Sequence, residues 1–135
     1  MKASLLSAAL LCLGGEAAAC GYCVEDKIAA TYDHAVVSRA LQRGQHLAFF
    51  HVEGAEPRPE ATRRALEDAA SMPGVEKASV RISPDLLTLS LAFDPQRVSL
   101  AAIIERLDRR LSARKLSVLP LRIMQRPADL TSVKR

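Results

Sequence analysis

The sequence predicts an α+β fold in which a four-stranded antiparallel sheet carries two helices on one side and is preceded by an extra amphipathic helix. Two observations predict it. Between residues 47 and 124, stretches with alternating apolar side chains are interrupted twice by stretches with helical spacing, in the order strand, helix, strand, strand, helix, strand. Before them, residues 24–43 contain no proline or glycine and carry an apolar stripe at helical spacing.

The chain begins with a predicted secretory signal peptide, residues 1–19. Lys2 precedes an apolar run at residues 5–13 that is too short to span a bilayer, and residues 17–19 are the small alanines that signal peptidase requires. We therefore expect a periplasmic or secreted protein of 116 residues. A lipoprotein anchored at Cys20 is an alternative, although its signal usually has a larger aliphatic residue three places earlier. A buried first helix of a cytosolic domain is a less favoured interpretation.

The length of the mature chain suits a single domain, but its charge is uneven. Residues 20–96 carry eight Lys or Arg against eleven Asp or Glu, whereas residues 97–135 carry ten against three. The basic part suits peripheral contact with an anionic membrane or an acidic partner, although the solvated face of a helix is the simpler interpretation. Nucleic acid is not expected as a partner, because this part has no aromatic side chain for base stacking.

Residues 24–43 are predicted to form one continuous amphipathic helix that ends at Gly44, because glycine commonly terminates helices. Glu25 and Asp26 fall in its first turn, where acidic side chains complement the helix dipole. Its apolar stripe consists of Val24, Ile28, Tyr32, Ala35, Val36 and Ala40.

The first strand is predicted at residues 47–53, an aromatic-rich stretch that ends at Gly54. A loop with two prolines follows. The next helix runs from Pro59 to about Ser71, since proline is tolerated in a first turn, and Pro73-Gly74 ends it.

An antiparallel hairpin is predicted next, with its turn at Pro84-Asp85. In residues 78–83, apolar side chains alternate with Ser79, Arg81 and Ser83. In residues 87–93, leucines and a phenylalanine alternate with Thr88, Ser90 and Ala92. Each strand is therefore expected to bury one face and to expose the other.

The last helix is predicted to begin at Ser99, with five apolar side chains at helical spacing and arginines on its other side. A final strand follows at residues 116–124, where Pro120 must lie at an edge or a bulge because it has no backbone N–H. The order of elements is the split βαβ, or ferredoxin-like, arrangement. It occupies residues 46–125, between an arm at 20–45 and a flexible tail at 126–135.

Several short pieces of this domain resemble the heavy-metal-associated domains of copper chaperones and metal-pumping ATPases. They are His51-Val52-Glu53-Gly54, residues 73–80, residues 91–95, and Ser99 with Ile103 and Ile104. The resemblance spans roughly 75 residues and implies a ferredoxin-like fold, metal handling and a metal transporter or carrier as partner. That family binds its metal through a Cys-x-x-Cys in the loop after the first strand. Here this loop, residues 54–59, contains no sulfur ligand, so no ligand is carried over to it.

The one reactive motif is Cys20-Gly21-Tyr22-Cys23, immediately before the first helix. Two thiols three positions apart can form a reducible disulfide or bind a soft metal through both sulfurs. Cleavage after Ala19 would add the α-amine of Cys20 as a nitrogen ligand. Because no Cys or His partners stand at zinc spacing, Cu(I) is favoured over Zn(II). We therefore predict a metal site at Cys20 and Cys23, where Glu25 and Asp26 favour a bound cation.

Other potential metal ligands are weaker candidates. His34 lies eleven residues beyond Cys23, about three turns along a straight helix, and cannot reach the motif from there. The remaining candidates are more simply explained as surface or strand histidines and core methionines, namely His46, His51, Met72 and Met124.

Two other functions remain open. The tetrapeptide CGYC resembles the active site of thioredoxin-fold disulfide isomerases, and Met72-Pro73 stands where that fold keeps a cis-proline, which implies an exported thiol-disulfide oxidoreductase. That fold, however, places its dithiol after a central strand and leaves the strand at 116–124 unexplained. The third function is a non-catalytic binding module with a structural Cys20–Cys23 disulfide. Metal binding and transfer without catalysis is the favoured function.

Overall fold

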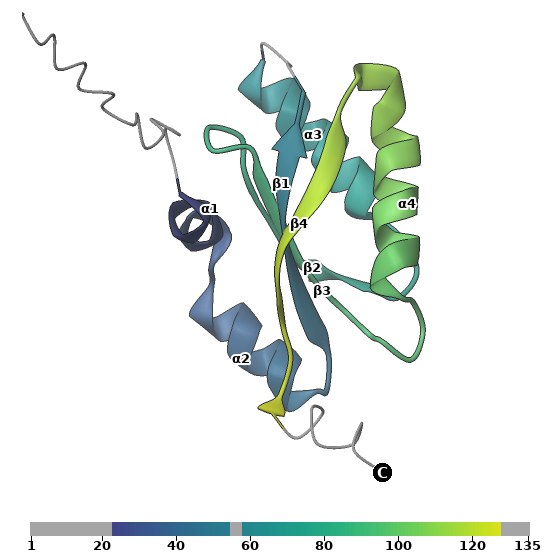
Figure 1. Cartoon of the computed structure of the whole chain (residues 1–135). Helices are drawn as coiled ribbons and strands as arrows, with labels where there is room; N and C mark the ends of the chain where they lie inside the picture. Colours follow the sequence, from purple (N-terminus) through teal and green to yellow (C-terminus); the bar gives the residue numbers. More distant parts are fainter. Residues whose placement is uncertain (1–22, 55–57, 128–135) are drawn as a thin grey trace, which may run out of the picture.

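The structure, a computed structural model, describes residues 23–54 and 58–127 (Figure 1). The predicted leader at 1–19, Cys20 and most of the predicted tail lie outside these residues. Four strands form one sheet in the order β2-β3-β1-β4, and every neighbouring pair is antiparallel. The strands are β1 at His46–Glu53, β2 at Val75–Ser83, β3 at Thr88–Phe93 and β4 at Ser117–Met124.

The helices lie in two layers, one on each side of this sheet (Figure 1). They are α1 at Val24–Thr31, α2 at His34–Gln42, α3 at Pro59–Ala70 and α4 at Leu100–Leu111, with a short 3-10 turn at Ser112–Arg114. From β1 to β4 the order confirms the predicted ferredoxin-like α+β fold. None of the helices in the described residues is long and apolar enough to cross a membrane.

The larger core lies between the sheet and the layer formed by α3 and α4. Alternate residues of β1 point into it, including Phe50, and they meet Leu66 of α3 and Leu107 of α4, all three fully buried. Ser99 caps α4 by accepting a hydrogen bond from the backbone N–H of Ala102 at 3.1 Å, as the predicted start of this helix requires. The five apolar side chains of α4 that the sequence places at helical spacing all pack into or against this core, as expected.

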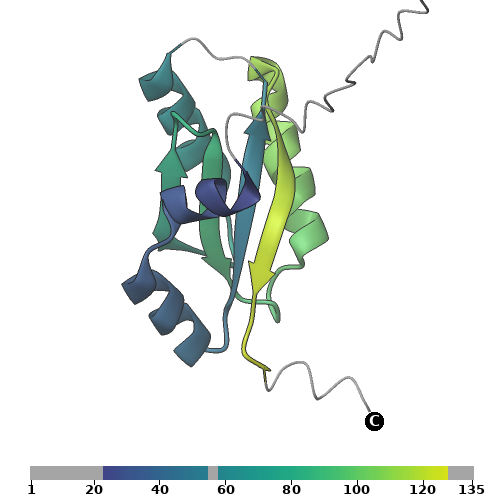
Figure 2. The ribbon, with the colours of Figure 1, turned by 60° about the vertical axis from the view of Figure 1, so that its left-hand side comes forward.

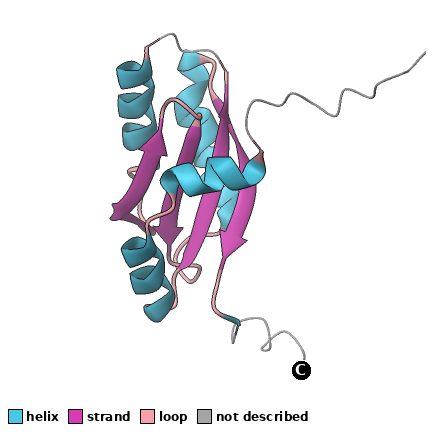
Figure 3. Cartoon of the chain, turned by 90° about the vertical axis from the view of Figure 1, so that its left-hand side faces the viewer, coloured by secondary structure: helices cyan, strands magenta, loops and turns pink. Residues whose placement is uncertain are grey.

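A second core covers the opposite face of the sheet, beneath α1 and α2. Helix α1 contacts all four strands and crosses them (Figures 2 and 3), and the cluster beneath the two helices contains Ile28, Val37 and Phe49. Because both faces are covered, every residue of β3 is buried. The prediction that Thr88 and Ser90 lie on an exposed face is therefore wrong.

The predicted continuous helix at 24–43 is also wrong, because the chain breaks between α1 and α2. Asp33 caps α2 by accepting hydrogen bonds from the N–H groups of Ala35 and Val36, at 3.0 and 3.2 Å. The Arg81 guanidinium donates to its second oxygen at 3.1 and 3.2 Å, which fixes the break against β2. The break leaves Tyr32, predicted to lie on the apolar stripe, 44% exposed.

Strand β2 contains an irregularity between Glu76 and Arg81 that reverses the predicted alternation there. Ser79, predicted to face outwards, is buried, whereas Ala78 is exposed. The Ser79 hydroxyl accepts from the N–H of Ala92 at 2.7 Å and donates to the carbonyl of Glu76 at 2.5 Å, so it replaces the missing ladder bond.

The prediction for Pro120 is confirmed. It lies in β4, an edge strand of the sheet, and next to a register shift opposite Phe49 and Phe50. A residue without a backbone N–H is tolerated at such a position.

Candidate metal site

Of the two cysteines in the predicted metal motif, Cys23 is the one that lies in the described part of the structure. It is the N-cap of α1, with extended backbone angles, and its thiol is exposed and forms no disulfide with any residue of 23–54 or 58–127. Helix α1 begins directly after it at Val24, as the sequence predicted. Cys20 lies outside the described residues.

The thiol of Cys23 lies beside acidic groups. Its Sγ donates a hydrogen bond to Oδ2 of Asp26 at 3.2 Å, and Glu25 occupies the same first turn. The Asp26 carboxylate favours a bound cation near the sulfur. The surroundings of Cys23 therefore suit a bound cation.

Glu25 also ties the start of α1 to the edge of the sheet. Arg122 of β4 donates hydrogen bonds to both oxygens of Glu25, one of them at 3.2 Å. These hydrogen bonds hold the pKa of Glu25 below its usual value of 4.5, and they raise the pKa of Arg122. Glu25 is thus committed to a structural ion pair, so Asp26 is the carboxylate with a direct contact to the thiol.

Helix α1 is held at its middle and its end as well. Nδ1 of His51 lies 3.2 Å from both Nζ of Lys27 and the carbonyl oxygen of Leu87, so one tautomer accepts from the ammonium group and the other donates to the carbonyl. Ser90 donates to the carbonyl of Thr31 at 3.1 Å. Several contacts therefore fix the helix that carries Cys23 on the sheet.

The histidines and methionines do not gather around Cys23. Nε2 of His34 lies within hydrogen-bond distance of Oγ of Ser38, at 3.4 Å, and the His46 ring packs edge-on against the Phe93 ring. Met72 is buried in the larger core, as expected of a packing residue, and Met124 packs against the second core. Within residues 23–54 and 58–127, no three His, Cys, Asp or Glu side chains are grouped so that they could hold a metal ion.

The loop that follows β1 begins in close contact with the start of β4. Gly54 has a φ of +122°, and a Cβ placed there would lie 2.4 Å from the carbonyl oxygen of Lys115. Residues 55–57 lie outside the described part of the chain. Since residues 54–59 contain no cysteine, this loop lacks the sulfur ligands of the heavy-metal-associated family.

No protein-family model and no curated protein matches the sequence. Among solved structures, the chain is similar to a copper binding domain from HMA7, a P-type ATPase, with 19% sequence identity and a TM-score of 0.48. The similarity covers 58% of this chain and 96% of that one. At this level of likeness the comparison does not decide what the chain does. The fold assignment rests on the chain's own strand order and pairing.

The contacts that position α1 are not predictable from the sequence near the cysteines. The contact between Cys23 and Asp26 is predictable, because side chains three residues apart at the start of a helix lie on the same side of it. The contacts of Glu25 with Arg122 and of Lys27 with His51 are not, since their partners lie 97 and 24 residues away.

Proposed function

We propose that the protein is an exported metal-binding protein that holds Cu(I) through the sulfurs of Cys20 and Cys23. The observation that carries the proposal is the exposed sulfur of Cys23 at the start of α1, three positions after Cys20. The hydrogen bond from this thiol to Asp26 adds support, because a cation that replaces the thiol proton would be neutralised in part by the carboxylate.

The donor set favours Cu(I) over Zn(II). Thiolates are soft ligands that select Cu(I), and two of them satisfy its low coordination number. A closed zinc site needs four ligands, and no grouped histidines or carboxylates complete such a set within the described residues. The α-amine of Cys20 joins the set if the leader is cleaved after Ala19.

The exposure of the site supports transfer of the metal rather than storage or catalysis. Cys23 lies at the surface, where an incoming thiolate from a transporter or carrier can reach the metal and exchange with the ligands one at a time. The rigid attachment of α1 keeps the second sulfur in place during such an exchange. Transfer to a partner in the periplasm or outside the cell is the function that we infer.

An anaerobic titration of the exported protein with Cu(I) and with Zn(II) tests this function. The intact mass of the protein establishes its N-terminus. A competing chelator of known metal affinity allows the dissociation constant to be determined. We expect one Cu(I) per chain to bind at sub-micromolar concentration. Cys20→Ser and Cys23→Ser should each abolish this binding, whereas His34→Ala, on the exposed start of α2, should leave it unchanged. Failure of the wild-type protein to bind either metal would refute the proposal.

The same preparation separates the two rival functions. A stable Cys20–Cys23 disulfide that resists glutathione indicates the structural module. A dithiol potential near that of disulfide isomerases, with activity on scrambled substrates, indicates the oxidoreductase. The fold does not favour the oxidoreductase: β4 pairs with β1 along its length, whereas the thioredoxin alternative leaves this strand unexplained.

A further inference from the structure

Three arginines gather at the opposite end of the α1–α2 pair from Cys23. Arg39 and Arg43 are one turn apart at the end of α2. Arg126 follows β4. Its guanidinium lies next to Gly44, since a Cβ atom placed on Gly44 would be 3.4 Å from a guanidinium nitrogen of Arg126. We call Arg39, Arg43 and Arg126 the arginine surface.

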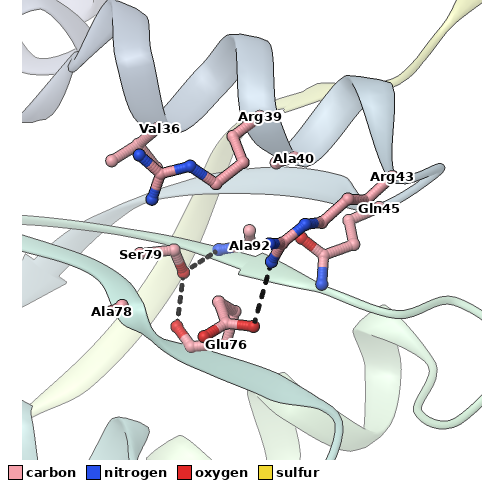
Figure 4. A pocket seen from close by; sticks show the side chains of 9 residues that line it. All are labelled: Val36, Arg39, Ala40, Arg43, Gln45, Glu76, Ala78, Ser79 and Ala92. Carbon is pink, nitrogen blue, oxygen red and sulfur yellow. Dashed lines mark hydrogen bonds and ion pairs between the residues drawn. The ribbon is translucent and has the colours of Figure 1, made fainter.

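A small hollow of about 30 Å³ lies under the first two arginines, between α2 and the irregular part of β2. Figure 4 shows the side chains of Arg39 and Arg43 reaching over it, with Ser79 and Ala92 on the opposite wall. The Ser79 hydroxyl is already occupied by its bonds to the backbone of Glu76 and Ala92. The arginines, together with Gln45 at the rim, are therefore the donors available to a ligand.

A second hollow, of about 530 Å³, lies next to the first, because Arg43 lines both. Its walls include Gly44, His46 and Arg126, with Asp94 and Gln96 on the far side. Asp94 accepts a hydrogen bond from the N–H of Gln96 at 2.9 Å, so one of its oxygens serves the local turn. The two hollows share the Arg43 side chain, and each is lined by one further arginine, Arg39 in the first and Arg126 in the second.

The arginine surface keeps a net positive charge, because three arginines line the two hollows against the two carboxylates of Glu76 and Asp94. Within the described residues, Arg39 and Arg126 form no ion pair, and Arg43 has a single loose one, to Glu76 at 3.9 Å. Both side chains of that pair are substantially exposed, 59% and 40%. Like charges one helical turn apart repel each other, so placing Arg39 and Arg43 together is unfavourable unless an anion binds.

We propose that the arginine surface binds an acidic peptide segment of a partner protein. The guanidinium fork matches a carboxylate, and Glu76 already places a carboxylate beside Arg43 in the first hollow. The three arginines are distributed over two hollows that share Arg43, which fits successive carboxylates of an extended peptide better than one small anion. This inference does not depend on metal binding at Cys23.

Fluorescence anisotropy with a labelled peptide of alternating glutamate and glycine tests the proposal, with the glutamine analogue as the control peptide. The full chain should bind the glutamate peptide, and binding should weaken between about 50 and about 200 mM salt as screening increases. The double variant Arg39→Gln/Arg43→Gln should weaken binding about tenfold. The matched control Arg106→Gln/Arg109→Gln removes the same charge from α4, on the other side of the sheet, and should change binding less than twofold.

Two further variants keep the test informative. Glu76→Gln removes the carboxylate that competes for Arg43 and should tighten binding about twofold. If the double variant fails to fold, Arg126→Gln, outside every helix and strand, should still weaken binding about threefold.

Three results would overturn the proposal. They are equal binding of the two peptides, an equal loss in the α4 control, and binding of phosphatidylserine vesicles or inorganic phosphate with no binding of the glutamate peptide.

Discussion

Truncating Ile28 to alanine is expected to loosen α1 while the rest of the domain stays folded. Ile28 is 4% exposed, and Thr31 is the only other buried residue of this helix. The truncation removes roughly three buried carbon groups, each worth about 0.8 kcal/mol, so the transfer term is about 2.4 kcal/mol. With a small residual cavity included, the total loss of free energy is about 2–3 kcal/mol. The other attachments of α1 are polar, so this loss falls mainly on its docking to the sheet.

Hydrogen exchange followed by mass spectrometry is the appropriate assay. A loss of about 2–3 kcal/mol corresponds to roughly 30- to 150-fold faster exchange of the α1 amides that open locally. Ile103→Ala is the matched control, because Ile103 is fully buried in the larger core and its truncation should cost about 2–5 kcal/mol for the whole domain. Equal acceleration of exchange in every element by Ile28→Ala would refute the idea that α1 docks as a separate unit. Unchanged α1 exchange would refute Ile28 as its anchor.

Three further predictions concern the backbone and one ion pair. Gly54→Ala should cost about 3 kcal/mol or more in urea unfolding, because its φ of +122° suits only glycine and the new Cβ would meet the Lys115 carbonyl. Lys115→Gly should raise the unfolding free energy by about 1 kcal/mol, since Lys115 is exposed with a left-handed φ of 57°. Hydrogen bonds from Val36 and Arg81 lower the pKa of Asp33 in the folded protein below its usual value of 3.8. Ionised Asp33 therefore stabilises the folded state fully above pH 3.8, and this stabilisation is lost as the pH falls through the pKa of Asp33 in the folded protein. The stability difference between wild type and Asp33→Asn should therefore shrink in acid; a difference that grows there would contradict the assignment.

The order of elements could be predicted because its signals are local. Proline and glycine mark the ends of α3 and the turn before β2, and apolar periodicity separates strands from helices. The break at Asp33 could not be predicted, because Arg81, which holds it, lies 48 residues away. The burial of Ser90 was also missed, since a hydroxyl is tolerated inside only when it finds a partner, here the Thr31 carbonyl 59 residues earlier.

The candidate site could be predicted in part for the same reason. The position of Cys23 at the start of a helix follows from the absence of helix breakers after it, and the structure confirms that position. Its attachments through His51 and Arg122 depend on the register of β1 and β4 and are not visible in the sequence around the cysteines. Cys20, the leader and export stay predictions, because these residues lie outside the described part of the chain.

The second helical layer connects the two proposals. Without α1 and α2, one face of the sheet would expose Phe49 and Ala92, so the layer covers an apolar surface that would otherwise meet water. Cys23 stands at the beginning of this layer and Arg43 just after its end, on different helices. Metal binding and peptide binding should therefore be separable by mutation, because substitutions without shared contacts have nearly additive effects. Cys23→Ser alone should leave the affinity for the glutamate peptide unchanged, and Arg39→Gln/Arg43→Gln alone should leave the affinity for Cu(I) unchanged. A large change in either affinity would mean that α1 and α2 transmit a change from one end to the other.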